Sequence, residues 1–165
     1  MVEVEIRRSR AQSDVLSEKD LEKDNCILCF NEIKFFAMGE CDHKNVCARC
    51  VLRIRLIMED DKCSICKTEC DEIVVSANKN LTWNEFERRW KKKAITDKED
   101  DTIYYEDVKA KAEGMKLRTL SCLIKDCQSR QVFPNVDSLR QHMESNHEKT
   151  FCKICLKGRT VFIRE

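Results

Sequence analysis

Apolar residues recur at helix-like spacings through the middle of the chain. Residues 51–58 (VLRIRLIM) have the pattern of a short helix, from which Arg53 and Arg55 are expected to reach solvent. A second helix is predicted to begin at TWNE (82–85), which has the Ser/Thr-x-x-Glu pattern of a helix N-terminus. The aromatic residues that then share one helical face are Trp83, Phe86 and Trp90.

Strand patterns lie on either side of this second helix. Residues 71–77 (DEIVVSA) and 102–107 (TIYYED) are rich in β-branched or aromatic residues, which favours strands. Residues 108–120 (VKAKAEGMKLRTL) have helical composition. We therefore expect residues 72–120 to form a structured spacer of mixed strands and helices.

Residues 1–24 contrast with this pattern, because most of them are charged or polar. Such a composition favours a flexible charged tail. The alternative is a short helix whose apolar side chains would be Val15, Leu16 and Leu21.

Composition narrows the class of protein. The 165 residues include 12 Cys but only 3 Gly and 1 Pro, which argues against a turn-rich sandwich and against a low-complexity chain. The N-terminus lacks the apolar run of a signal peptide, and no stretch approaches the roughly 20 apolar residues of a membrane span. We expect a cytosolic or nuclear protein without membrane contact. In either compartment thiols stay reduced, so closely paired cysteines indicate metal sites.

Four pairs of metal-ligating residues lie between residues 25 and 71. Eight thiolate and imidazole ligands at such spacings are typical of two closed tetrahedral zinc sites. The stretch CDHKNVCARC (41–50) holds four ligands, but a single site there would leave the flanking pairs without partners. Spacing alone allows either a sequential or an interleaved assignment of pairs to ions. The pairs are Cys26 with Cys29, Cys41 with His43, Cys47 with Cys50, and Cys63 with Cys66.

A further ligand set favours a third zinc ion, because two thiols and two imidazoles complete a tetrahedral site. The stretch FPNVDSLRQH also resembles a two-Cys, two-His zinc finger, which implies a ββα module with a helix that starts near Val136. The interval between the Cys and His pairs is two residues longer than the common twelve, which suggests a looser loop. The four ligands are Cys122, Cys127, His142 and His147.

Sequence-specific DNA binding by this finger is not expected. Its base-reading positions would be Asn135, Ser138 and Gln141, none of which is Arg or Lys. Basic and acidic residues balance within residues 122–149, so attraction to phosphate is weak.

Three cysteines remain outside these sets. Cys152 and Cys155 supply half of a zinc site, and no histidine follows them. We interpret residues 149–165 as the start of a further zinc finger whose ligands lie beyond Glu165; the alternative is a free CxxC pair. Cys70 is expected to be structural or simply exposed.

The order of the four pairs in residues 25–71 resembles a RING finger with a single histidine. That family implies cross-brace wiring: the first and third pairs hold one zinc, and the second and fourth hold the other. It also implies an E3 ubiquitin ligase, which holds a ubiquitin-charged E2 enzyme beside a substrate lysine and forms no covalent ubiquitin intermediate. Thus Cys26, Cys29, Cys47 and Cys50 would bind one ion, and Cys41, His43, Cys63 and Cys66 the other.

The RING resemblance also assigns E2-binding residues by position. Leu28 occupies the apolar contact position before the second cysteine, and Ile54 lies where many RING fingers place an apolar helix residue. Lys67 stands at a position that is usually Arg, so the charge is kept but the planar fork is lost. Ser64 replaces a usual Pro.

The complete order of modules is similar to a narrower family, the RING and zinc-finger E3 ligases that sense collided ribosomes. The similarity covers residues 25–160, including the ending SNHEKTFCKIC of the histidine finger. It implies ubiquitin and an E2 as partners, small-subunit ribosomal proteins as substrates, and a role in translation quality control. The finger region and the basic run RRWKKK (88–93) then become candidate contacts with the ribosome in the cytoplasm, and the run also with RNA. The alternative is a solvated helix face with Trp90 packed inward.

The sequence thus predicts small zinc-stabilised α+β modules: a cross-brace RING finger, a mixed spacer and a two-Cys, two-His finger. The predicted function is that of an E3 ubiquitin ligase fragment. One alternative is a nucleic-acid-binding regulator whose RING makes only protein contacts. Another is a ligase of a different pathway whose histidine finger binds protein or ubiquitin. The expected divisions are 1–24, 25–71, 72–120, 121–148 and 149–165.

Overall fold

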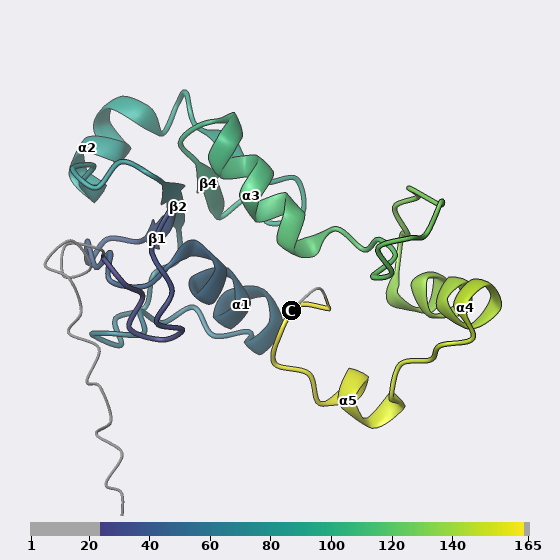
Figure 1. The fold of residues 1–165 in the computed structure, drawn as a ribbon. Coiled ribbons are helices and arrows are strands. Elements are labelled where there is room, and N and C mark those ends of the chain that lie inside the picture. The colour runs from purple at the N-terminus through teal and green to yellow at the C-terminus, as the bar shows by residue number, and fades with distance from the viewer. Residues whose placement is uncertain (1–23, 164–165) are drawn as a thin grey trace, which may run out of the picture.

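The computed structural model describes residues 24–163, and Figure 1 shows their arrangement. The predicted tail at residues 1–24 lies, except for Asp24, outside the described residues. Most of the described chain surrounds a small sheet, and a separate helical module follows it in the chain. No helix within the described residues has the length and apolar composition needed to cross a membrane.

A four-stranded sheet joins the cysteine-rich segment to the spacer. Its strand order is β1-β2-β4-β3, with β2 and β4 parallel and the outer pairs antiparallel. Because β1 comes from the expected RING segment and the other strands from the expected spacer, the two segments share one sheet. The division between residues 25–71 and 72–120 itself stays a prediction. The strands are β1 (Phe36–Met38), β2 (Ile73–Ser76), β3 (Ile95–Thr96) and β4 (Ile103–Tyr105).

Successive strand residues enter two different cores, because side chains alternate across a sheet. Phe36, Met38 and Val74 pack in one core with Cys26, Cys47 and Cys50. Ala37 and Val75 point to the other face, which is covered by helices α1 (Ala48–Met58) and α3 (Val108–Arg118).

The helix ends agree with local sequence signals. In α3, the Asp107 carboxylate accepts a hydrogen bond from the Ala110 amide at 2.7 Å, which satisfies an amide that the helix leaves free. Thr82 accepts one from the Glu85 amide at 3.3 Å, as its pattern predicted. The helices predicted at residues 51–58 and 108–120 are confirmed, with the first beginning three residues earlier at Ala48.

Trp90 does not share the buried face predicted for Trp83 and Phe86, so the alternative in which it packs inward is wrong. The chain forms α2 (Trp83–Glu85) and continues as a π-helical turn, η2 (Phe86–Trp90), in which the Lys91 amide donates to the Phe86 carbonyl at 2.8 Å. Trp83 and Phe86 are buried, whereas Trp90 keeps 41% of its surface exposed. The wider turn breaks the α-helical register on which the shared face depended.

Arg55 also differs from expectation, since only 8% of its surface is exposed. Its guanidinium donates to the carbonyl of Cys70 at 2.8 Å, to the carbonyl of Asp71, and to Thr102 Oγ1 at 3.0 Å. An ion pair of 3.2 Å links it to Asp61. Arg55 therefore ties α1 to the loop that precedes β2, whose two carbonyls it supplies with hydrogen bonds, and to Thr102 before β4.

The histidine finger contains helix α4 (Val136–His147), which begins where the sequence predicted. The hairpin expected before it is reduced to one isolated bridge between Ser121 and Val132. Helix α5 (Lys153–Lys157) follows, and the chain then returns toward α1 (Figure 1), where Phe162 is buried in the core that contains Leu52 and Ile103.

Candidate metal centres

Two loops of the same construction present the outer cysteine pairs. The amide of Phe30 donates to the Cys26 carbonyl at 2.8 Å, and the amide of Lys67 donates to the Cys63 carbonyl at 2.9 Å. In both loops the residue after the second cysteine takes a left-handed backbone, with φ of 59° for Phe30 and 62° for Lys67. Such a turn directs both thiols of a Cys-x2-Cys pair toward one point, as a shared ion requires.

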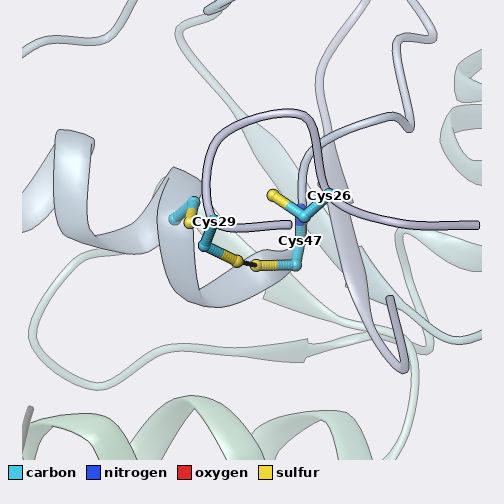
Figure 2. Close-up of side chains that lie close together, drawn as sticks. Cys26, Cys29 and Cys47 are labelled. Carbon is cyan, nitrogen blue, oxygen red and sulfur yellow. Dashed lines mark hydrogen bonds between the residues drawn. The ribbon is translucent and has the colours of Figure 1, made fainter. Parts of the chain in front are cut away.

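The first cluster consists of Cys26, Cys29, Cys47 and Cys50, whose sulfurs lie within 4.8 Å of one another. Figure 2 shows the side chains of Cys26, Cys29 and Cys47 converging, with the sulfurs of Cys29 and Cys47 facing each other at 3.7 Å. The Cys47 amide lies 3.3 Å from the Cys26 sulfur. Cys47 immediately precedes α1 and Cys50 lies in its first turn, so this helix fixes half of the ligands.

The second cluster consists of Cys41, His43, Cys63 and Cys66, again within 4.8 Å. His43 Nδ1 lies 3.7 Å from the Cys63 sulfur. The Asp42 carboxylate between the first two ligands accepts a hydrogen bond from the Trp83 amide at 2.6 Å, which holds the ligand loop against α2. The geometry matches the interleaved wiring, and a sequential assignment does not fit it.

The separations between ligand atoms fit zinc. A tetrahedral ion about 2.3 Å from sulfur and about 2.0 Å from nitrogen separates two sulfurs by about 3.8 Å and a sulfur from a nitrogen by about 3.5 Å. The sulfur–sulfur contact in the first cluster is 3.7 Å, and the sulfur–nitrogen contact in the second is 3.7 Å. Both the donor types and their spacing therefore suit a zinc ion in each cluster.

The thiols of these two clusters differ in pKa. Burial raises the pKa of Cys41 to about 12 and that of Cys47 to about 11. Burial opposes ionisation of Cys29 too, but the Asn31 amide and the Arg49 side chain outweigh it and lower its pKa to about 6. The Thr68 hydroxyl and amide lower the pKa of Cys66 to about 6. A bound cation would bring all the thiols to the thiolate form.

The third cluster brings together Cys122, Cys127, His142 and His147. The Cys122 sulfur lies 3.3 Å from His147 Nε2, and the Cys127 sulfur lies 3.5 Å from His142 Nε2. A small core of Phe133, Leu139 and Met143 supports these ligands. The centroid of the Phe133 ring lies 4.9 Å from that of the His142 imidazole, which fixes the orientation of that ligand.

The last cysteine pair is not part of a cluster among the described residues. Cys152 and Cys155 are exposed at the start of α5, so their completion by further ligands stays a prediction. Cys70 is buried, and its sulfur lies 3.9 Å from that of Cys41. Gly39 leaves room for it, since a Cβ there would lie 2.7 Å from the Cβ of Cys70. Cys70 is therefore a structural residue that packs against the second cluster.

The predicted E2-binding residues come from three different parts of the cysteine-rich segment: its first loop, helix α1 and its second loop. Leu28 sits on the first loop with 42% of its surface exposed, and Lys67 is exposed on the second loop. Ile54 is half-buried on α1 and borders the same hollow as Ile65. Leu28 is not among the residues that line this hollow.

Three exposed apolar residues on these loops were missed from the sequence: Ile27, Phe30 and Ile65. Phe30, which has a left-handed backbone, is 79% exposed, and Ile65 is exposed beside Cys66. The signal that could have found them is an apolar residue inside or directly after a Cys-x2-Cys pair, where an exposed turn is expected.

Curated relatives match most of this chain. It is 32% identical over 157 residues to the E3 ubiquitin-protein ligase ZNF598 of Danio rerio, which covers 90% of this chain and 15% of the relative. It is 28% identical over 144 residues to the Homo sapiens protein of the same name, covering 85% of this chain and 15% of that relative. The Schizosaccharomyces pombe E3 ubiquitin-protein ligase hel2 is 26% identical over 148 residues, which cover 90% of this chain and 19% of that protein.

The chain spans only about a fifth or less of the length of these relatives. No solved structure matches it. The family model described as the ZNF598 RING finger domain matches residues 21–116, which is more than half of the chain and contains both clusters of the cross-brace. The chain belongs to the ZNF598 RING finger family.

Proposed function

We propose that this chain acts as a RING-type E3 ubiquitin ligase that docks a ubiquitin-charged E2 enzyme. The observation that carries the proposal is the interleaved pair of clusters, whose two loops hold exposed apolar residues at fixed positions. Membership of the ZNF598 RING finger family and the ligase names of its relatives support it.

The contribution of the chain to transfer is positioning. All three histidines of the sequence lie in metal clusters, so none is available as a general base. In the proposed reaction the substrate lysine attacks the E2–ubiquitin thioester, an amide forms, and the E2 thiol leaves. Holding E2 and ubiquitin in one orientation accelerates that step by removing unproductive arrangements. Zinc, when bound, supplies the rigidity of the two loops.

Each proposed contact residue has a distinct part in this arrangement. Leu28 offers an apolar side chain on the first loop, and Ile54 offers one from α1 beside Ile65. Lys67 presents an exposed ammonium on the second loop, where it would bond both E2 and ubiquitin. An ammonium lacks the two-pronged geometry of a guanidinium, so we expect a weaker restraint on ubiquitin than an arginine would give.

The test is a ubiquitination assay with E1, ubiquitin and a panel of E2 enzymes. Wild-type protein should form ubiquitin chains with at least one E2. Leu28→Ala should abolish chain formation, whereas Val108→Ala removes a side chain that is 73% exposed on α3 and should retain it. If no E2 supports activity above background, or both variants behave alike, the proposal fails.

We further propose that the substrates are small-subunit ribosomal proteins on stalled or collided ribosomes in the cytoplasm. The support is the family resemblance in the order of RING, spacer and histidine finger, together with family membership. Co-sedimentation with ribosomes and ubiquitination of small-subunit proteins would test this. Modification of free histones to the same extent as ribosomes would contradict it.

A further inference from the structure

A basic segment with an exposed tryptophan lies on the spacer, away from the metal ligands in sequence. Residues 83–93 contain five basic and two acidic residues, a net charge of +3, whereas the whole chain carries only +1. This segment is therefore more basic than the chain as a whole. The exposed members, which we call the η2 surface, are Arg88, Arg89, Trp90, Lys92 and Lys93.

The η2 surface stands on a fixed base. Phe86 and Trp83 are buried in the core beneath it, with ring centroids 5.3 Å apart. The amide of Lys93 donates to the Trp90 carbonyl at 2.8 Å, which closes the turn after the tryptophan. Lys91 is held by an ion pair with Glu72. Because the backbone is anchored on both sides, the exposed side chains start from a defined arrangement.

Most of the charge on this surface is not neutralised inside the fold. Within residues 24–163, Arg88 and Lys92 make no ion pair. Arg89 reaches Glu85 only at 3.9 Å, with 77% of its side chain exposed. An exposed pair of that length contributes little stability to the fold, so these cations remain available to bind a partner.

The tryptophan decides which partner fits. The Lys93 ammonium lies 6.0 Å from the centroid of the Trp90 ring, so charge and an aromatic face are adjacent. Phosphates would pair with the cations, and an unstacked base would stack on the ring. Single-stranded RNA offers both groups, whereas an acidic peptide offers only the charge. A π-helical turn at this position agrees with a functional surface, since such turns are frequent at functional sites.

We propose that the η2 surface binds single-stranded RNA, with the basic side chains on phosphates and a base stacked on Trp90. The histidine finger does not offer an equivalent surface, because its basic and acidic residues balance. RNA binding does not require E2 docking, so the proposal goes beyond ligase activity. That it contributes to ribosome association rests on the proposed function.

The test is fluorescence anisotropy with a labelled single-stranded oligoribonucleotide at several salt concentrations. Four cations on phosphates give a slope of log affinity against log salt of about −3, and an Arg88→Gln, Lys92→Gln double variant should halve it. Trp90→Ala should weaken binding about tenfold, whereas Trp90→Phe keeps an aromatic face and should retain most affinity. The matched control is Lys109→Gln with Lys116→Gln, two exposed lysines of α3, which should bind as wild type.

Three results would overturn the proposal. The first is equal weakening by the α3 control, and the second is no effect of Trp90→Ala in protein with unchanged circular dichroism and zinc content. The third is displacement of RNA by polyglutamate at equal charge concentration, which would indicate an acidic protein as the partner. E2-dependent ubiquitination by the η2 variants should equal wild type, and its loss would assign the surface to E2 instead. Failure of RNA binding with ubiquitination intact would refute this proposal alone.

Discussion

Replacing Arg55 by methionine tests whether the RING segment and the spacer form one cooperative unit. The change keeps most of the aliphatic stem but removes the donors to the carbonyls of Cys70 and Asp71 and to Thr102. Each buried acceptor left without a partner costs about 1–3 kcal/mol. Some of this is offset, because Arg55 Nε is itself buried without a hydrogen bond. We expect a net loss of about 3 kcal/mol in the free energy of unfolding.

Urea denaturation of the zinc-loaded protein, followed by tryptophan fluorescence, measures this loss. Trp83 is buried in the core and reports on its exposure. The matched control is Arg89→Met, which removes a guanidinium that is largely exposed and should change stability by less than about 0.5 kcal/mol. A loss below about 1 kcal/mol for Arg55→Met would refute the reasoning, as would a loss equal to that of the control.

Three further predictions concern other parts of the fold. Burial would raise the pKa of Asp97, but hydrogen bonds from the Glu99 amide and Tyr105 and the charge of Arg118 outweigh it and lower the pKa. The stabilisation by the Asp97 carboxylate is therefore present above pH about 4 and is lost as the pH falls further. Asp97→Asn should cost about 1–3 kcal/mol in the free energy of unfolding at pH 7 and progressively less below pH 4, measured in parallel denaturation series. Gly114→Ala should destabilise by about 1–3 kcal/mol in the same measurement, because its Cβ would lie 2.6 Å from Tyr105 Cε1; a stability gain of the size that helix propensity gives would contradict the packing. Cys70→Ala should leave zinc stoichiometry by mass spectrometry unchanged, whereas Cys63→Ala should lower it; the reverse order would make Cys70 a ligand.

The metal clusters could be predicted from the sequence because their ligands come in closely spaced pairs. A Cys-x2-Cys turn is local, so its spacing carries most of the information about the site. Which pairs share an ion depends on the path of the chain between them, and here the family resemblance was needed. The structure places Cys47 and Cys50 against the first loop through the start of α1.

Other features depend on long-range packing that a local pattern does not contain. Strands β1 and β3 have only three and two residues, too few for a period-2 pattern to be read. Arg55 has the composition of a solvent-facing helix residue, yet the acceptors that hold it come from residues 70–102. Trp90 leaves its expected face because of a single π-helical turn. Tertiary contacts thus decide the position of Arg55, whereas a local change of helix type decides that of Trp90.

The most direct test of the central claim is single-turnover discharge of a preformed E2–ubiquitin thioester to free lysine. The zinc-loaded chain should accelerate discharge, and Leu28→Ala or removal of zinc by a chelator should return the rate to that of E2 alone. Val108→Ala should discharge as wild type does. Undiminished discharge by the chelator-stripped protein, or by Leu28→Ala, would contradict a zinc-braced surface that orients the E2.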